Sequence, residues 1–244
     1  MPREKYREIY VDLKEKIEQG DYKESDMIPS ENILSKEYQC TRNTIRRAIR
    51  ELIHRGYVQS VHGKGVQVIY HPIEQAHFTV GGIESFAESA RRNKKKPGTA
   101  VMQFAELTVD DRMSRRTGFH EGAEVYYIQR VRSLDDVPLI YDINVFLKSE
   151  TPGLNETIAN SSIYKYLEDD LGMQITTSNR IITAELATPI DTKYLALDDY
   201  DFVCVITGRT FNSKGIQFEY TQSRHRPDYF SFQDTAVRTK YEDG

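Results

Sequence analysis

One stretch near the N-terminus, TRNTIRRAIRELIHRG from Thr41 to Gly56, constrains the fold of the first part of this chain. Its apolar side chains recur at helical spacing, so one stripe of the helix faces a core; they are Ile45, Ala48, Ile49, Leu52 and Ile53. Its arginines fall off that stripe and point outward; they are Arg42, Arg46, Arg47 and Arg50. An exposed arginine row on a packed helix suits insertion into a DNA major groove. A solvated charged face is the alternative that this helix alone leaves open.

The segments before this stretch predict two further helices. Residues 6–17 carry an apolar stripe at helical spacing, and Gly20 is placed to end that helix. Ser30 follows a proline and is a candidate N-cap for a second helix that runs to about residue 38. The expected inward residues of this second helix are Ile33, Leu34 and Tyr38. Two helices joined by a tight turn predict a helix-turn-helix in which Thr41–Arg55, capped by Thr41, is the recognition helix.

A hairpin is predicted directly after the recognition helix. Gly56 ends the helix, Tyr57–Val61 alternates as a strand, and Val66–Tyr70 forms a second strand. The turn between them, His62-Gly63-Lys64-Gly65, places Lys64 beside the DNA backbone or in the minor groove. A hairpin in this position is a wing. The order of helix, helix, recognition helix and hairpin therefore favours DNA binding over a solvated charged helix.

The distribution of charge agrees with a DNA-binding head on an acidic body. The whole chain has 33 basic and 37 acidic residues, a formal net charge of −4. Residues 1–71 hold 13 Lys and Arg against 11 Asp and Glu, so the remainder carries the excess of acid. A positive patch is needed only where a protein touches phosphate, and the overall negative charge does not exclude DNA binding.

Nothing in the sequence predicts export, membrane insertion or a metal site. No apolar run approaches the roughly 18 residues of a membrane helix, and the first residues, MPREKYREIY, lack the apolar segment of a signal peptide. Cys40 and Cys204 are far apart, and neither belongs to a CxxC pair. We therefore expect a cytoplasmic protein that needs no cofactor or metal.

The segment 28–68 resembles the winged-helix head of the GntR family of bacterial repressors. That family reads PSE-x-x-L-A, S/T-R-x-T-V-R-x-A-L and G-x-G-T-x-V, and this chain departs mainly at Val66-Gln67 in the wing. The resemblance covers nearly all of residues 5–70 and implies DNA contacts at Ser30, Glu31, Arg42, Asn43, Thr44, Arg46, Arg47, Lys64 and Gly65. For Glu31, an interaction with the dipole of its own helix remains the alternative.

A second domain follows a linker that we place at residues 71–79. Its pattern is that of an antiparallel sheet with helices inserted between the strands, which is an α+β fold. The expected helices are Ile83–Arg92, Asp110–Gly118, Ser162–Leu171 and Pro189–Leu197. The expected strands are Thr99–Asp110, Ala123–Leu134, Leu139–Leu147, Ile175–Thr188, Phe202–Asn212 and Ile216–His225, with a turn at Asp135-Asp136-Val137-Pro138.

Two arginines are candidates for binding an anion in this domain. Arg130 and Arg132 are two residues apart on one expected strand, so both side chains leave the same face of the sheet. Paired guanidinium groups that converge on one site suit a phosphate or a carboxylate. Cross-strand ion pairs with nearby acidic residues are the other interpretation, and the spacing alone does not exclude them.

The second domain, about residues 80–238, resembles the effector-binding (UTRA) domain of the HutC subgroup of the GntR family. The similarity is carried by SIYKYLEDDLG and by the ending EYTQSRHRPDYFSF. It implies a fold like that of chorismate lyase and a site for a small effector. The positions that match the subgroup's anion cradle are Ser85, Phe86, Arg130, Arg132 and Ser162. The positions that match its sugar-binding wall are Asp142, Glu219, Tyr220 and His225, of which His225 replaces a usual tyrosine.

Within that subgroup, the chain is most similar to the repressors of trehalose operons in Gram-positive bacteria. The resemblance implies a homodimer on a palindromic operator, released by trehalose 6-phosphate, although the same residues suit N-acetylglucosamine 6-phosphate. Two other classes of function stay open. One is a lyase-like enzyme fused to a DNA-binding head, although the sequence shows no evident catalytic nucleophile paired with a general base. The other is a structural DNA-binding protein without an effector, in which the two arginines have a purely structural role.

Overall fold

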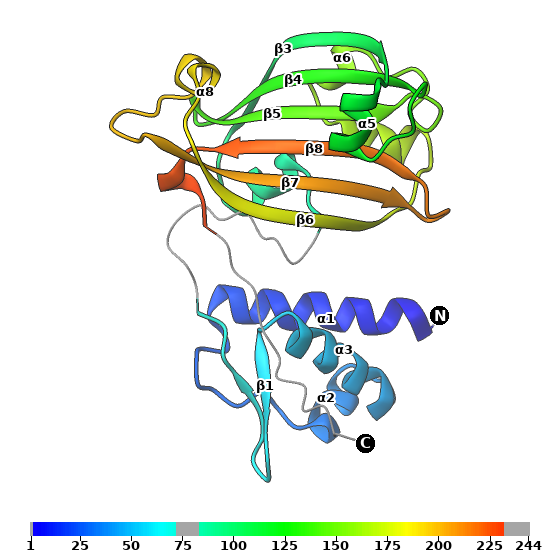
Figure 1. Cartoon of the computed structure of the whole chain (residues 1–244). Coiled ribbons are helices and arrows are strands. Elements are labelled where there is room, and N and C mark those ends of the chain that lie inside the picture. The colour runs from blue at the N-terminus through cyan, green and yellow to red at the C-terminus, as the bar shows by residue number, and fades with distance from the viewer. Residues whose placement is uncertain (1, 72–82, 232–244) are drawn as a thin grey trace, which may run out of the picture. The chain divides into compact units, whose positions relative to one another are not determined.

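A computed structural model describes residues 2–71 and 83–231 of the chain, which fall into two compact units, one in each range (Figure 1). Most of the expected linker, 71–79, lies outside the described residues. Within the two described ranges, no helix has both the length and the apolar character that crossing a bilayer requires.

The first unit is a three-helix head followed by a two-stranded hairpin. Its elements are α1 (Pro2–Gln19), α2 (Glu31–Glu37), α3 (Arg42–His54), β1 (Val58–Val61) and β2 (Gly65–Val68). The two strands are antiparallel. The apolar stripes of the helices meet in one core that contains Ile9, Leu13, Ile17, Leu34, Ile45, Ala48, Ile49, Leu52, Val58 and Val68. The periodicity of the sequence thus predicted the correct buried face of α1 and α3.

One local expectation about this unit is wrong. Ile33 is 57% exposed, because the seven-residue helix α2 offers only Leu34 to the core. Ser30 is the N-cap residue of α2, as the sequence predicted, although its side chain makes no capping hydrogen bond. The segment before α2 forms no strand of its own, but it touches the wing through one isolated bridge between Met27 and Gln67. The Ser25 and Ile28 amides donate to the Val68 and Val66 carbonyls, both at 2.9 Å.

The second unit is built on one antiparallel sheet of six strands. They are β3 (Pro97–Thr108), β4 (Glu124–Leu134), β5 (Val137–Leu147), β6 (Ile175–Leu186), β7 (Phe202–Asn212) and β8 (Gln217–His225). Their spatial order is β3-β4-β5-β8-β7-β6, so the last strand in sequence lies at the centre of the sheet between β5 and β7. This position brings residues near 220 beside residues near 143.

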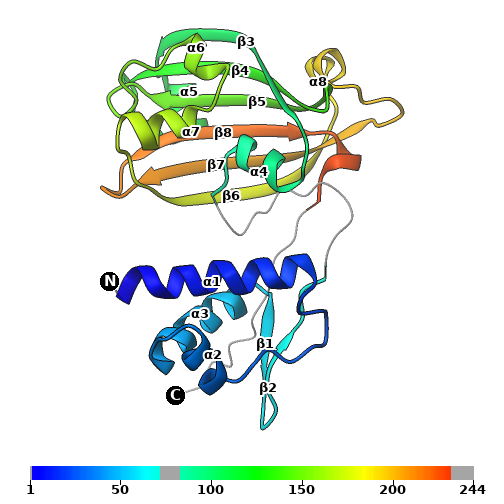
Figure 2. The ribbon, with the colours of Figure 1, turned by 180° about the vertical axis from the view of Figure 1, so that it is seen from behind.

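Helices lie on both faces of the sheet. One face carries α4 (Phe86–Arg92), α6 (Glu156–Ala159) and α7 (Ile163–Lys165), and α7 continues into a wider turn over Tyr166–Asp170 (Figure 2). The opposite face carries α5 (Asp111–Thr117) and α8 (Pro189–Tyr194) (Figure 1). Sequence patterns missed α6 and the short 3₁₀ turn at Pro227–Tyr229, both too short to show a period.

The β4–β5 hairpin fixes the register of the strands that carry the candidate arginines. Its turn consists of Asp135 and Asp136, whose φ values of 49° and 65° are those of a two-residue turn between right-twisted strands. The expected four-residue turn is therefore too long, since Val137 and Pro138 belong to β5 and pair with β4. In the resulting register Arg130 faces Asp142, and Val131 faces Tyr141.

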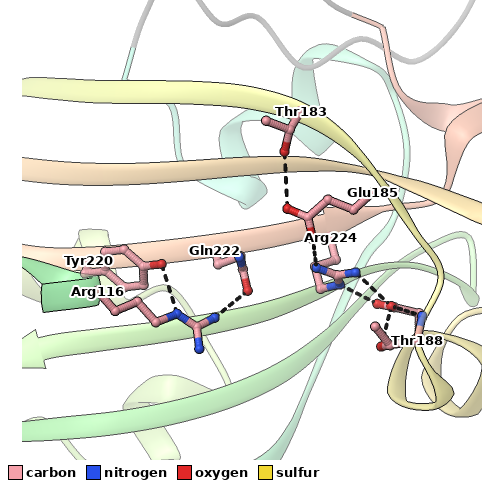
Figure 3. Close-up of polar contacts among 8 residues, drawn as sticks. Arg116, Thr183, Glu185, Thr188, Tyr220, Gln222 and Arg224 are labelled. Atoms are coloured by element: carbon pink, nitrogen blue, oxygen red, sulfur yellow. Dashed lines mark hydrogen bonds and ion pairs between the residues drawn. The ribbon is translucent and has the colours of Figure 1, made fainter. Parts of the chain in front are cut away.

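A buried ion pair attaches α8 to the sheet. Arg224, on β8, donates to both carboxylate oxygens of Asp191 at 2.7 and 3.0 Å and to Glu185 at 2.7 Å (Figure 3). Asp191 is fully buried and also accepts from the backbone and side chain of Thr188 at the start of α8. One carboxylate thus both caps the helix and neutralises a guanidinium that is removed from water.

We expect Asp191→Ala to lower the free energy of unfolding by about 3 kcal/mol, because it leaves Arg224 buried with one partly exposed partner. Urea denaturation followed by circular dichroism measures the change. Asp198→Ala is the matched control, since it removes an Asp–Arg226 pair whose carboxylate is 65% exposed, and it should change stability by less than about 1 kcal/mol. Equal losses in the two variants would contradict this account.

Candidate functional site

The outer face of α3 presents the DNA-binding residues expected from the sequence. Arg42, Asn43, Arg46 and Arg47 are all exposed. Thr41 caps the helix, since its hydroxyl accepts from the Thr44 amide at 3.3 Å. The helix therefore begins at the point where its polar side chains are concentrated, which is the end that reads base edges in helix-turn-helix proteins.

Two of these arginines are held by neighbouring helices. The Arg46 guanidinium donates from Nε and Nη2 to the two carboxylate oxygens of Glu31, at 3.1 and 2.8 Å. This hydrogen bond lowers the pKa of Glu31. Arg47 lies over the ring of Tyr6 in α1, 3.9 Å from its centroid. The sequence left open whether Glu31 interacts with the dipole of its own helix or with DNA. It did not reveal that Glu31 orients Arg46.

The tip of the wing is a turn that depends on two glycines. Gly63 and Gly65 have φ values of 70° and 121°, and Lys64 between them is exposed. A Cβ atom at Gly65 would also lie 3.2 Å from the Met27 methyl group. The turn is therefore restricted to glycine at this position, and the lysine is presented without a bulky neighbour.

The second unit contains a cavity of about 410 Å³ on the sheet face that carries α4, α6 and α7. Eight of the nine residues expected at the effector site line it, namely Ser85, Phe86, Arg130, Arg132, Asp142, Ser162, Glu219 and His225. Polar lining residues that the sequence reasoning missed are Asn144, Asn160, Tyr164, Ser178, Arg180 and Thr210. The alternation of side chains along β5, β6 and β7 could have identified several of them once the strand order was known.

Arg130 is the most deeply buried cation of the cavity, at 2% exposure. Its Nε and Nη2 donate to the Asn144 side-chain oxygen at 3.2 and 2.7 Å, and Nη1 donates to the Ala159 carbonyl at 3.3 Å. No carboxylate in the described part of the chain forms an ion pair with it. Burial lowers the pKa of Arg130 to about 9, so the group is charged at neutral pH.

Within the described residues, Arg132, unlike Arg130, forms an ion pair with a carboxylate. Its Nε donates to Asp142 at 2.6 Å, and its guanidinium lies 5.0 Å from the centroid of the Phe86 ring. Burial alone would raise the pKa of Asp142, but Arg132 and Arg130 outweigh it and hold that pKa below its usual value. The interpretation as a cross-strand ion pair therefore applies to Arg132 and not to Arg130.

A buried carboxylic acid lies elsewhere on the cavity wall. Glu219 accepts from the Tyr164 hydroxyl at 2.5 Å and from the Asn144 side-chain nitrogen at 3.3 Å. Burial raises the pKa of Glu219 and, by the same cause, that of Tyr164. Ser178 and Thr210 lie on the same wall, with their hydroxyl oxygens 3.3 Å apart. This part of the cavity offers hydroxyl and carboxyl groups, which suit the hydroxyls of a carbohydrate.

Two serines at the cavity serve first as helix caps. Ser85 accepts from the Glu88 amide at the start of α4, and Ser162 accepts from the Lys165 amide at the start of α7, both at 3.3 Å. Both residues therefore have local structural partners as well as a place on the wall. His225 is buried in the wall, and burial lowers its pKa to about 4, so its imidazole is neutral at pH 7.

Tyr220 does not lie in the expected effector site. It follows Glu219 directly on β8, so its side chain leaves the opposite face of the sheet. There it packs with Val109 and Phe119, and its hydroxyl accepts from Nε of Arg116 at 3.4 Å (Figure 3). Gln222 lies on the same face and accepts from the same guanidinium at 2.8 Å. Tyr220 is therefore a core residue under α5.

Comparisons with known proteins agree with this architecture. Residues 5–68 match the family model "Bacterial regulatory proteins, gntR family", and residues 92–231 match the UTRA domain. The transcriptional regulator TreR of Bacillus subtilis is 34% identical over 97% of this chain and 98% of its own length. The repressor NagR of the same organism is 25% identical over 93% and 92%.

Solved structures show the same fold. The transcriptional regulator YydK of B. subtilis superimposes with a TM-score of 0.80 at 21% identity, over 96% of this chain and 99% of its own. The effector-binding domain of the B. subtilis trehalose repressor aligns with a TM-score of 0.53 and 31% identity, over 59% of this chain and 99% of its own. The chain belongs to the gntR family of bacterial regulatory proteins, and within that family it is a DNA-binding transcriptional repressor with a UTRA domain, not an enzyme.

Proposed function

We propose that this protein is a homodimeric repressor of a sugar-utilisation operon and is released from its operator by a sugar phosphate, trehalose 6-phosphate. It acts in the cytoplasm, where both its operator and a phosphorylated sugar are present. The observation that carries the proposal is the position of Arg130, a buried cation at the cavity whose contacts are with neutral oxygens. A phosphate is the ligand group that can form the direct ion pair that Arg130 lacks in the described part of the chain.

The other contacts of the cavity favour a sugar attached to that phosphate. Glu219, Tyr164 and Thr210 form a polar wall that can accept and donate hydrogen bonds to hydroxyl groups. The volume of about 410 Å³ falls in the range of cavities that enclose small molecules. The identity of 34% with TreR over nearly the whole chain, and of 31% with the effector domain of a trehalose repressor, supports trehalose 6-phosphate as that molecule.

Release follows from the need of two heads to fit one palindromic operator. Each head binds one half-site, so the distance between the heads must match the spacing of the half-sites. An effector that favours a different arrangement of the heads lowers operator affinity without touching the DNA-binding residues. The effector can shift the equilibrium between the two arrangements of the heads by no more than the difference in its binding free energy to them. A difference of a few kcal/mol suffices for release.

Mobility-shift titrations on the DNA upstream of the protein's own gene test the release. Trehalose 6-phosphate should dissociate the wild-type complex, whereas Arg130→Met and Arg132→Met should need at least about tenfold more, because each removes a charge-assisted contact to phosphate. Operator affinity without effector should stay within about twofold of wild type. Arg115→Met, which removes an exposed arginine of α5, is the matched control and should respond as wild type does.

The outcome with other ligands decides the details of the proposal. Release by N-acetylglucosamine 6-phosphate but not by trehalose 6-phosphate would keep the mechanism and replace the effector. A complex that withstands every phosphosugar tested would refute effector-controlled release. Turnover of a phosphosugar by the purified protein would contradict a purely regulatory role.

Operator recognition gives a separate prediction. Arg42→Ala should weaken operator binding by about 1–3 kcal/mol and relax sequence preference, because an arginine at the start of α3 reads a base edge. Lys64→Ala should weaken binding to all sequences alike and reduce the salt dependence by about one phosphate contact. His54→Ala, at the far end of α3, serves as the control, and fluorescence anisotropy at several salt concentrations measures all three. A loss confined to His54→Ala would reverse the assignment of the reading end.

A further inference from the structure

Asn144 occupies the centre of the polar network in the cavity. It lies on β5, is 3% exposed, and accepts two hydrogen bonds from Arg130 on its side-chain oxygen, at 3.2 and 2.7 Å. Its side-chain nitrogen donates to Glu219 at 3.3 Å and to the Thr221 hydroxyl at 2.9 Å. These partners fix the orientation of the amide, because only its oxygen can accept from a guanidinium.

The two buried arginines of the described chain are held in different ways. Arg224 is 6% exposed and donates to the carboxylates of Asp191 and Glu185. Arg130 is 2% exposed, and the residue that receives its strongest hydrogen bond is the neutral Asn144. Asp142 and Glu219 attract Arg130 through space, but its direct hydrogen bonds go to neutral oxygens. Asn144 therefore stands where an acid would form a direct ion pair with Arg130.

We propose that Asn144 determines the selectivity of the cavity for anionic ligands, because it orients Arg130 through hydrogen bonds without neutralising its charge. Arg130 then makes no direct ion pair in the described part of the chain, although Asp142 and Glu219 attract it through space, and its guanidinium is available to a phosphate group of the ligand. This inference rests on the proposed function, since it assumes that a phosphosugar occupies the cavity. Asn144, an uncharged residue, then sets the preference of the cavity for phosphorylated over unphosphorylated sugar.

Asn144 also meets a second requirement that aspartate cannot. It accepts from Arg130 and at the same time donates to Glu219, so it links the cation to the carboxyl group of the sugar wall. An aspartate carboxylate at position 144 could not donate a hydrogen bond to Glu219 unless one of the two acids were protonated. The amide is the side chain of this shape that satisfies both neighbours at once.

The test compares Asn144→Asp with the wild-type full chain by isothermal titration calorimetry. The ligands are trehalose 6-phosphate, N-acetylglucosamine 6-phosphate, inorganic phosphate and unphosphorylated trehalose. We expect Asn144→Asp to weaken binding of the phosphosugar that wild type prefers by at least about tenfold, because the new carboxylate pairs with Arg130 and repels the phosphate. Binding of unphosphorylated trehalose should weaken by a smaller factor or not at all. The thermal midpoint of the ligand-free protein should stay the same or rise.

Two further variants exclude simpler explanations. Asn155→Asp adds the same charge at the N-cap of α6, outside the cavity, and should bind phosphosugar as wild type does. Asn144→Asp combined with Glu219→Gln restores a donor opposite position 144 and removes the repulsion between two acids. This double variant keeps the test valid if Asn144→Asp alone does not fold, and it too should lose at least about tenfold in preference for phosphorylated over unphosphorylated sugar.

The outcomes separate the inference from the proposed function. Failure of the wild-type protein to bind any phosphosugar refutes the proposed function and, with it, the inference. Wild-type binding of a phosphosugar with unchanged affinity in Asn144→Asp overturns the inference alone. An equal loss for phosphorylated and unphosphorylated sugar, together with a lower thermal midpoint, shows that Asn144 merely supports the fold and also overturns it.

Discussion

The cavity of the second unit depends on one constraint, which is that a guanidinium removed from water must keep its hydrogen bonds. Arg130 meets this constraint with the Asn144 oxygen on the neighbouring strand and the Ala159 carbonyl at the end of α6. The β4–β5 register and the position of α6 are therefore both tied to this one side chain. In the described ranges no carboxylate forms an ion pair with it, and in the function that we propose the phosphate of the ligand takes that place.

The two units use the same residue type in opposite ways. In the head, Arg46 is exposed and pairs with Glu31, and an exposed ion pair contributes little to stability. In the second unit, Arg130 is buried, and its burial lowers its pKa. In the function that we propose, the exposed arginine exchanges its partner for DNA at low cost, and the buried one binds a small anion where the dielectric constant is low.

The sequence predicted most helices and strands, because apolar spacing is a local signal and the turns carry characteristic residues. It could not predict that β8 lies between β5 and β7, since strand order depends on contacts between distant segments. Alternation correctly placed Arg130 and Arg132 on one face. The same rule excludes Tyr220 from a site that contains its neighbour Glu219, and family resemblance alone led to its inclusion.

Asn144 shows why the chemistry of a site is harder to predict than its fold. An uncharged side chain gives no signal in a search for ion pairs, and the nearest acid in the register, Asp142, lies directly opposite Arg130. The structure shows that Asp142 pairs instead with Arg132, which is less buried. Asp142 therefore pairs with the outer arginine, and the inner one is held by a neutral amide and a backbone carbonyl. Spacing along the strands does not reveal this pairing, because it depends on which guanidinium reaches the carboxylate in the folded sheet. In the function that we propose, the inner guanidinium is the one that binds the phosphate.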